Sequence, residues 1–187
     1  MSTTAVEIPG YLTGTWAIDP VHSEVSFTVR HMMVSKVRGR FDKFEGTIVT
    51  RENPLESAVT ASVDLSSINT GQEQRDAHIR SADFFEVETY PTMTFASTGV
   101  RADGDDFLLD GDLTLKGVTK PVTFKLEVSG FGPDSYGGTR VGFSATTEIN
   151  RLDFGVSFNG PIPGVPGGVA VSEKVTINLE IEGVLQA

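Results

Sequence analysis

Most of the residues that could do chemistry in this chain lie in one short segment, residues 69–91. The segment holds a cluster of ionisable side chains, at Arg75, Asp76, His78, Arg80 and Asp83. A histidine beside a carboxylate can move a proton, and an arginine can hold an anionic oxygen. Because loops and insertions usually carry the functional residues of a sheet protein, this segment is the first candidate for a functional site.

A capping signal predicts that the segment forms one short helix over about residues 71–85. Thr70 and Glu73 match a capping box, in which the threonine hydroxyl accepts from the amide of Glu73. At 100° per residue, Asp76 and Arg80 form an outward pair in the favourable acid-first order. The opposite, inward face carries Arg75, His78, Ile79 and Ala82. An inward arginine and histidine are unusual on a packing face, so the helix is predicted to cap a cavity.

The remaining sequence alternates apolar and polar residues with the period of two that is typical of β-strands. Near the N-terminus, Val25 and Phe27 alternate with polar neighbours, and His31 is in phase with them. Turn signals such as Asp103-Gly104 separate the runs. About eight strands at this spacing predict an all-β, antiparallel sandwich or barrel, and a closed barrel of this size can hold one small ligand.

The composition excludes several classes of function. The formal net charge of −10 argues against binding nucleic acid and against docking on anionic membranes through a basic patch. Without cysteine, the chain has no disulfide, thiolate nucleophile or cysteine-bound metal. It shows neither a signal-peptide pattern nor the roughly 20 apolar residues of a membrane span. These features predict a cytoplasmic protein without stable membrane insertion.

Metal and hydrolase motifs are missing from the sequence. His22, His31 and His78 lack the spacing of a zinc site, so we expect no metal and no cofactor. There is no Gly-x-Ser-x-Gly motif, and the adjacent Asp105 and Asp106 coincide with a turn signal. The residues therefore give little support to a catalytic site.

Apolar residues favour a ligand cavity instead. The twelve phenylalanines are spread over most of the predicted elements. The segment 158–171, FNGPIPGVPGGVAV, is too rich in proline and glycine for regular structure, yet it is apolar, so we expect it to cover something. A hollow barrel with an apolar wall and a polar mouth suits a lipid, with the tail inside and the head group at the rim.

Several motifs, in the right order, resemble those of the YceI-like family, lipocalin-like proteins associated with binding polyisoprenoids and other lipids. The resemblance covers residues 15–185. The motifs are WAIDPVHSEVSF at 16–27, HMMVS at 31–35, VRGRF at 37–41, RDAHIRSADFF at 75–85, GDLTLKGVTKPV at 111–122 and INRLDFG at 149–155. This resemblance implies an eight-stranded antiparallel, lipocalin-like barrel with a helical insert.

The same resemblance implies the domain organisation and the partners. We expect a flexible N-terminal tail at residues 1–13 and a single barrel domain at 14–187. The implied ligand is a long-chain lipid or polyisoprenoid, and a homodimer is compatible with the family. Family members are often exported, whereas this chain shows no signal peptide.

Combining the motifs with the phase of the strands gives candidate ligand-binding residues. The polar mouth is predicted to consist of His31, Arg75, His78 and Asp83. The apolar wall is predicted to consist of Phe27, Val29, Phe84, Phe85, Phe95, Phe143 and Phe154, with Phe158 and Ile162 closing it. A register shift of one residue would turn a strand's candidates outward.

The sequence therefore predicts a non-catalytic protein that binds, transports or stores an isoprenoid, an isoprenoid quinone or a fatty-acid-like amphiphile. Two alternatives stay open. One is an enzyme that acts on a lipid head group through Arg75, His78 and Asp83. The other is a stress-response module whose barrel is fully packed with side chains.

Overall fold

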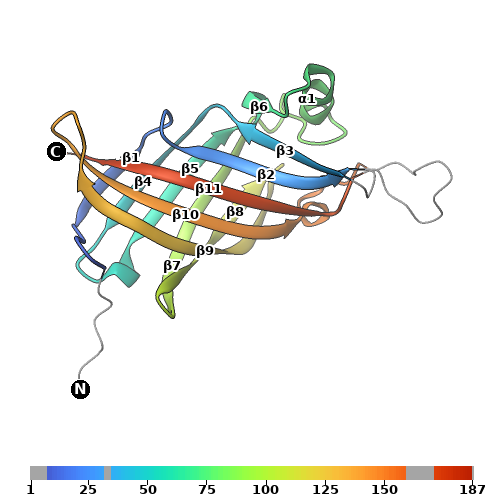
Figure 1. Ribbon diagram of the computed structural model, residues 1–187. Helices are drawn as coiled ribbons and strands as arrows, with labels where there is room; N and C mark the ends of the chain where they lie inside the picture. Colours follow the sequence, from blue (N-terminus) through green and yellow to red (C-terminus); the bar gives the residue numbers. More distant parts are fainter. Residues whose placement is uncertain (1–7, 32–34, 159–170, 187) are drawn as a thin grey trace.

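A single antiparallel sheet forms most of the molecule (Figure 1). The computed structural model describes residues 8–31, 35–158 and 171–186. Its strands are β1 (Gly14–Ile18), β2 (Glu24–His31), β3 (Ser35–Phe41), β4 (Phe44–Thr50), β5 (Ala58–Asp64), β6 (Ile68–Asn69), β7 (Thr92–Asp103), β8 (Asp106–Leu115), β9 (Val118–Pro133), β10 (Thr139–Asn150) and β11 (Lys174–Leu185). Its helical elements are α1 (Glu73–Arg80) and the 3-10 turns η1 (Pro54–Glu56), η2 (Leu65–Ser67) and η3 (Arg151–Phe154).

Pairing of β1 with β11 closes the sheet into a barrel. The strands β1, β4, β5, β7, β8, β9, β10 and β11 follow one another around it, and Trp16 on β1 lies opposite Leu185 on β11. Strands β2 and β3 extend the same wall toward α1, because β11 pairs with β2 along its first half and with β1 near its end. The predicted eight-stranded antiparallel barrel with one helical insert is confirmed.

Alternation along the strands explains which side chains fill the barrel. On β8, Phe107, Leu109 and Leu113 are buried, and the residues that follow them are exposed or half-buried. This is the pattern of a strand that buries one face. At the end of the barrel opposite α1, Trp16 is fully buried and donates from Nε1 to the hydroxyl of Thr50 at 2.9 Å.

The insert between β6 and β7 contains the predicted helix, but the helix is shorter and is capped differently. Gln72 rather than Thr70 is the N-cap, and its side-chain oxygen accepts from the amide of Arg75. The Thr70 hydroxyl instead bonds the side chains of Arg75 and Asp76. The capping-box prediction is wrong because these two side chains compete successfully for the threonine. Within the described ranges, no helix is long and apolar enough to span a membrane.

The predicted outward pair of Asp76 and Arg80 is also wrong. Asp76 is only 8% exposed, and its Oδ1 accepts from the amide and the hydroxyl of Thr70 at 2.9 and 2.5 Å. Buried polar groups need partners, and here the carboxylate satisfies the backbone that leads into α1. Angular position on the helix could not reveal this, because the partner lies in the turn before the helix.

Candidate functional site

Two apolar cavities lie inside the barrel. The distal cavity, of about 160 Å³, lies at the end opposite α1, and the helix-side cavity, of about 290 Å³, lies at the end that carries α1. Val25, Met93 and Ile177 line both of them. These three side chains therefore lie between the two adjacent cavities.

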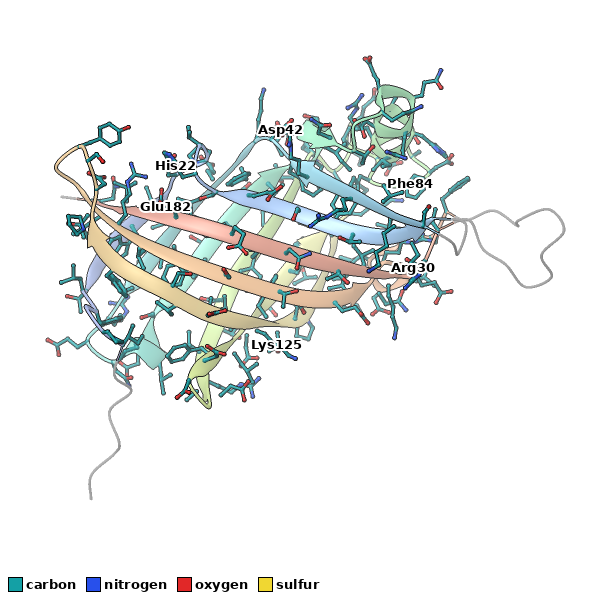
Figure 2. All side chains as sticks on the ribbon, viewed as in Figure 1. His22, Arg30, Asp42, Phe84, Lys125 and Glu182 are labelled. Atoms are coloured by element: carbon teal, nitrogen blue, oxygen red, sulfur yellow. The ribbon has the colours of Figure 1, made fainter. Side chains whose placement is uncertain are left out.

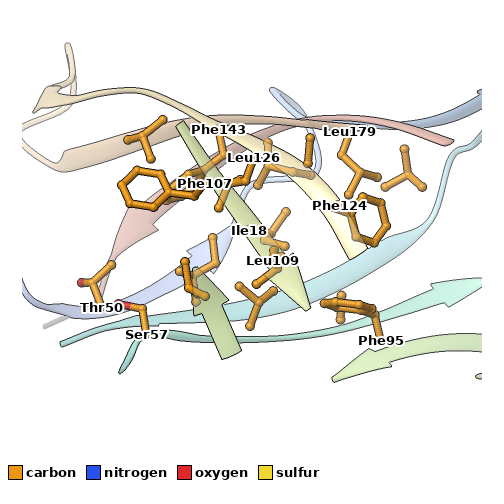
Figure 3. A pocket seen from close by; sticks show the side chains of 18 of the residues that line it. Ile18, Thr50, Ser57, Phe95, Phe107, Leu109, Phe124, Leu126, Phe143 and Leu179 are labelled. Carbon is orange, nitrogen blue, oxygen red and sulfur yellow. The ribbon is translucent and has the colours of Figure 1, made fainter. Parts of the chain in front are cut away.

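Aromatic and aliphatic side chains form the wall of the distal cavity (Figure 3). Phe95 and Phe124 meet edge to face, with ring centroids 5.4 Å apart. The Phe95 ring lies on the backbone of Gly111, where an added Cβ would come within 2.3 Å of the ring. Gly111 therefore leaves Phe95 the room it needs beside the wall and helps to set how far the ring reaches into the cavity.

A phenylalanine ring that lies over a glycine also borders the helix-side cavity, on another pair of strands. The ring of Phe27 on β2 lies over Gly39 on β3, where an added Cβ would come within 2.4 Å of it. Phe27 also packs against Phe41, with centroids 5.7 Å apart. The insert completes this cavity, and its contribution includes the apolar side chains Ile79, Phe84 and Phe85.

Polar side chains of α1 reach the helix-side cavity together with the apolar ones. Arg75 lines it and donates from Nε and Nη2 to the hydroxyl and the carbonyl oxygen of Thr70, both at 2.8 Å. His78 lines it as well, and its Nε2 lies 2.8 Å from Oδ2 of Asp83. The side chains of His78 and Asp83 are 44% and 52% exposed, so this pair sits at the surface rather than in a closed catalytic pocket.

Aromatic contacts tie His78 to the cavity wall. Its ring meets Phe84 and Phe158 edge to face, with centroids 5.1 and 4.9 Å apart. Phe84 and Phe158 also contact each other at 5.2 Å. Figure 2 shows Phe84 at the α1 end of the barrel. The His78–Asp83 pair therefore fixes the imidazole over two phenylalanines that line the helix-side cavity.

The structure divides the sequence-predicted residues between the two cavities. Asp83 lines neither cavity but pairs with His78, and Phe154 is 2% exposed within the core and also lines neither. The side chain of His31 and the whole of Ile162 lie outside the described residues. The distal cavity receives Phe95 and Phe143, and the helix-side cavity receives Phe27, Val29, Arg75, His78, Phe84, Phe85 and Phe158.

Sequence reasoning missed Arg151, which also lines the helix-side cavity. This residue is only 4% exposed, and it donates to the carbonyl oxygens of Ser172, Val156 and Val171 at 2.9, 2.7 and 3.2 Å. Burial lowers the pKa of its guanidinium, and the nearby Glu173 carboxylate opposes this effect. The sequence did contain a signal for its burial. Arg151 follows the buried Ile149 by two positions at the end of β10, so it continues the buried face of that strand.

A second arginine, Arg140, lies at the opposite end of the barrel, where it pairs with Glu182; Figure 2 labels Glu182 and the neighbouring His22 at this end. Arg140 contacts Asp19, Asp134 and Glu182 at 2.6, 2.8 and 2.9 Å. Hydrogen bonds from His22 and then Arg140 hold the pKa of Asp19 well below its usual range. The ligand atoms of Asp19, His22 and Glu182 lie within 4.8 Å of one another, but Arg140 already contacts both carboxylates, so we interpret the group as a structural network.

Comparisons with known proteins agree with this geometry. The model of the YceI-like domain matches residues 16–183. Protein YceI of Escherichia coli O17:K52:H18 is 40% identical over 167 residues, which cover 88% of this chain and 83% of that protein.

Two solved structures share the fold. BcnA of Burkholderia cenocepacia has a TM-score of 0.76 at 23% identity, over 88% of this chain and 98% of that one. A polyisoprenoid binding domain of Saccharophagus degradans, implicated in plant cell wall breakdown, has a TM-score of 0.70 at 20% identity, over 94% of this chain and 100% of that one.

Proposed function

This chain belongs to the YceI-like family, and on that premise we propose that it is a non-catalytic carrier or store that holds a long-chain amphiphile inside its barrel. The proposed ligand is an isoprenoid, an isoprenoid quinone or a fatty-acid-like molecule. A protein with the same fold is a polyisoprenoid binding domain, although the likeness to it shows the fold alone.

The adjacency of the two cavities carries this proposal. Val25, Met93 and Ile177 line both cavities, so an extended chain that displaces these side chains would run from the α1 end into the distal cavity. Each methylene removed from water contributes about 0.8 kcal/mol. Some ten or more methylenes would thus offset an association cost on the order of 4–15 kcal/mol. The phenylalanine walls provide the apolar surroundings that such a chain requires.

Native mass spectrometry tests the proposal directly. The purified protein should carry a bound molecule of lipid mass, which organic extraction removes and which an added isoprenoid or fatty acid replaces. Rebinding should also raise the thermal midpoint of the extracted protein, because a ligand that binds only the folded state stabilises it. A protein that is always empty and gains no stability from either lipid class would overturn the proposal.

A cavity-filling variant locates the bound chain. Ala145 on β10 lines the distal cavity, whereas Ala96 on β7 is exposed and lines neither cavity. Ala145→Phe places a ring where the chain would lie, so the affinity for a hexadecyl chain should fall by about tenfold or more, or about 1.4 kcal/mol. Ala96→Phe makes the same change on the outer face and should leave the affinity unchanged.

The enzyme alternative makes a different prediction at His78. If Arg75, His78 and Asp83 act on a head group, His78→Ala abolishes turnover of a lipid ester or phosphate and leaves binding intact. Under our proposal, no turnover is detected with the wild type, and the variant loses only affinity. The exposure of the His78–Asp83 pair favours the carrier. The two cavities likewise disfavour a fully packed barrel.

Location and assembly are further proposals. We propose a cytoplasmic location, which fractionation of the source cells would test. We also propose a homodimer, which light scattering on a sizing column would distinguish from a monomer. Neither proposal is needed for ligand binding, because both cavities are formed by one chain.

A further inference from the structure

The helix-side cavity reverses the charge balance of the protein. The whole chain has 25 acidic and 15 basic residues. Among the described residues, however, every ionisable side chain that lines this cavity is basic, at Arg30, Arg75, His78 and Arg151. The distal cavity does not share this feature, because its lining includes Glu45 and no arginine or lysine.

Arg151 is the most deeply buried of these basic side chains, with 4% exposure. An arginine has five N–H groups, and three backbone carbonyls accept from this one. In the part of the chain that the structure describes, its other two N–H groups have no acceptor and no carboxylate lies within 4.0 Å of it, so the Glu173 carboxylate acts on it only from a greater distance. The segment 159–170 contains no acidic residue in its sequence.

A buried guanidinium without a carboxylate is energetically unfavourable unless its charge is met from elsewhere. Carbonyl oxygens satisfy hydrogen bonds but carry no net charge, so they compensate desolvation only in part. An acidic group entering the helix-side cavity would supply the missing charge. Arginine is also the side chain best suited to binding a carboxylate or phosphate through two parallel hydrogen bonds.

We propose that the helix-side cavity selects amphiphiles with an acidic head group, a carboxylate or a phosphate, and that Arg151 is the residue that determines this specificity. Arg75, which lines the same cavity, adds a second positive charge. The proposal rests on the proposed function, because it requires the tail to occupy the barrel. It also orients the ligand, with the head group at the α1 end and the tail directed to the distal cavity.

A matched set of C16 ligands tests the proposal on the lipid-extracted protein. Hexadecanoate, hexadecyl phosphate and hexadecan-1-ol share one chain, so the ratio of their dissociation constants reports the head group alone. The wild type should bind one or both of the acidic ligands roughly 10- to 100-fold more tightly than the alcohol. Which of the two binds more tightly identifies the head group as a carboxylate or a phosphate.

Variants assign the preference to residues. Arg151→Gln should bring the ratio close to one, and Arg75→Gln should lower it in part. Arg40→Gln should leave the ratio unchanged, because Arg40 lies outside both cavities and pairs with Asp42 at 2.9 Å. Partial unfolding of Arg151→Gln lowers all three apparent affinities by one factor, which cancels in the ratio. If that variant does not fold, the wild-type ratio still decides whether the cavity prefers acidic head groups, and Arg75→Gln still reports the share that Arg75 contributes.

The outcomes separate this inference from the proposed function. Equal binding of acid and alcohol by the wild type would overturn the inference and leave the carrier intact. Tight binding of the alcohol by the wild type, with no gain from either acidic head group, would have the same meaning. Failure of all three ligands to bind would overturn the carrier and the inference together.

Discussion

The two ends of the barrel each contain an arginine that three oxygen-bearing groups hold in place, but the groups differ in charge. Arg140 contacts the carboxylates of Asp19, Asp134 and Glu182, whereas Arg151 contacts three backbone carbonyls. The first guanidinium is compensated within the protein and ties strands together. The second is buried beside a cavity, and the Glu173 carboxylate acts on it only from beyond ion-pair distance. The partners of a buried charge, rather than its identity, therefore indicate whether it is available to a ligand.

The largest effect should come from replacing Arg151. Arg151→Gln removes the N–H groups that donate to the carbonyl oxygens of Val156, Val171 and Ser172, at a cost of about 1–3 kcal/mol for each carbonyl that becomes buried and unpaired. We expect the free energy of unfolding to fall by about 3 kcal/mol or more, as measured by urea denaturation at pH 7.

Arg40→Gln is the matched surface change, and it should alter stability by no more than about 0.5 kcal/mol. If both variants were equally stable, the buried hydrogen bonds of Arg151 would contribute no more to stability than the surface pair of Arg40 does.

Glycines beneath aromatic rings should produce the next largest effect. Gly111→Ala forces Phe95 off the distal wall, and Gly39→Ala forces Phe27 off the helix-side wall. Overpacking of this kind costs about 1–3 kcal/mol. Each variant should also weaken lipid binding, because the displaced ring enters a cavity.

Gly132→Ala is the control for both, since an added Cβ at Gly132 meets nothing within 4 Å. Thermal melts with and without lipid measure both effects. Unchanged binding in both cavity variants would argue that the rings do not border the ligand.

The Arg140 end should respond to acid in a way that the Arg151 end does not. Because the folded pKa of Asp19 is depressed, its contribution to stability is present above its ordinary pKa of about 3.9 and is lost as pH falls through the lower folded value. Asp110 behaves similarly, since Arg101 and Thr123 lower its pKa to about 2.

Asp19→Asn should therefore make the loss of stability between about pH 4 and pH 2 shallower without abolishing it. Arg151→Gln should leave the slope unchanged, because no carboxylate pairs with Arg151 in the described structure. Urea denaturation at a series of pH values measures both slopes. A flatter slope in Arg151→Gln would contradict the contrast between the two ends.

The smallest effect on stability should come from His78→Ala. The His78–Asp83 pair is about half exposed, and surface pairs of this kind contribute at most about 1 kcal/mol. We expect a change of less than about 0.5 kcal/mol by chemical denaturation. A large loss of stability would mean that the imidazole holds the insert in place through Phe84 and Phe158 rather than bordering a ligand.

The sequence predicted the barrel well because alternation on each strand is a local property. The period of two around Val25 and Phe27 identifies one buried face without any knowledge of the partners. Glycines beneath rings were harder to anticipate, since Phe95 and Gly111 lie on different strands. Only the register of β7 and β8 brings them together.

The candidate site was predicted less completely, for a physical reason that Asp76 and Arg151 illustrate. Each is a charged residue whose position depends on backbone groups outside its own element. Asp76 accepts from Thr70 in the turn before α1, and Arg151 donates to the carbonyls of Val156 and Ser172, which are far apart in the sequence. Helical phase and residue type do not contain this information. For Arg151, the alternation along β10 indicated that the side chain is buried, but not which carbonyl groups it contacts.

Closure through β1 and β11 has a consequence for how the protein forms during synthesis. The strand that seals the barrel, β11, leaves the ribosome after its partners, and it must insert between β10 on one side and β1 and β2 on the other. Until β11 pairs with these strands, the barrel is open along one side and the strand edges there are unpaired. Contacts between segments as far apart in the sequence as β1 and β11 form slowly. A nascent chain that meets a long apolar molecule at this stage could close around it, so that loading and folding become one event.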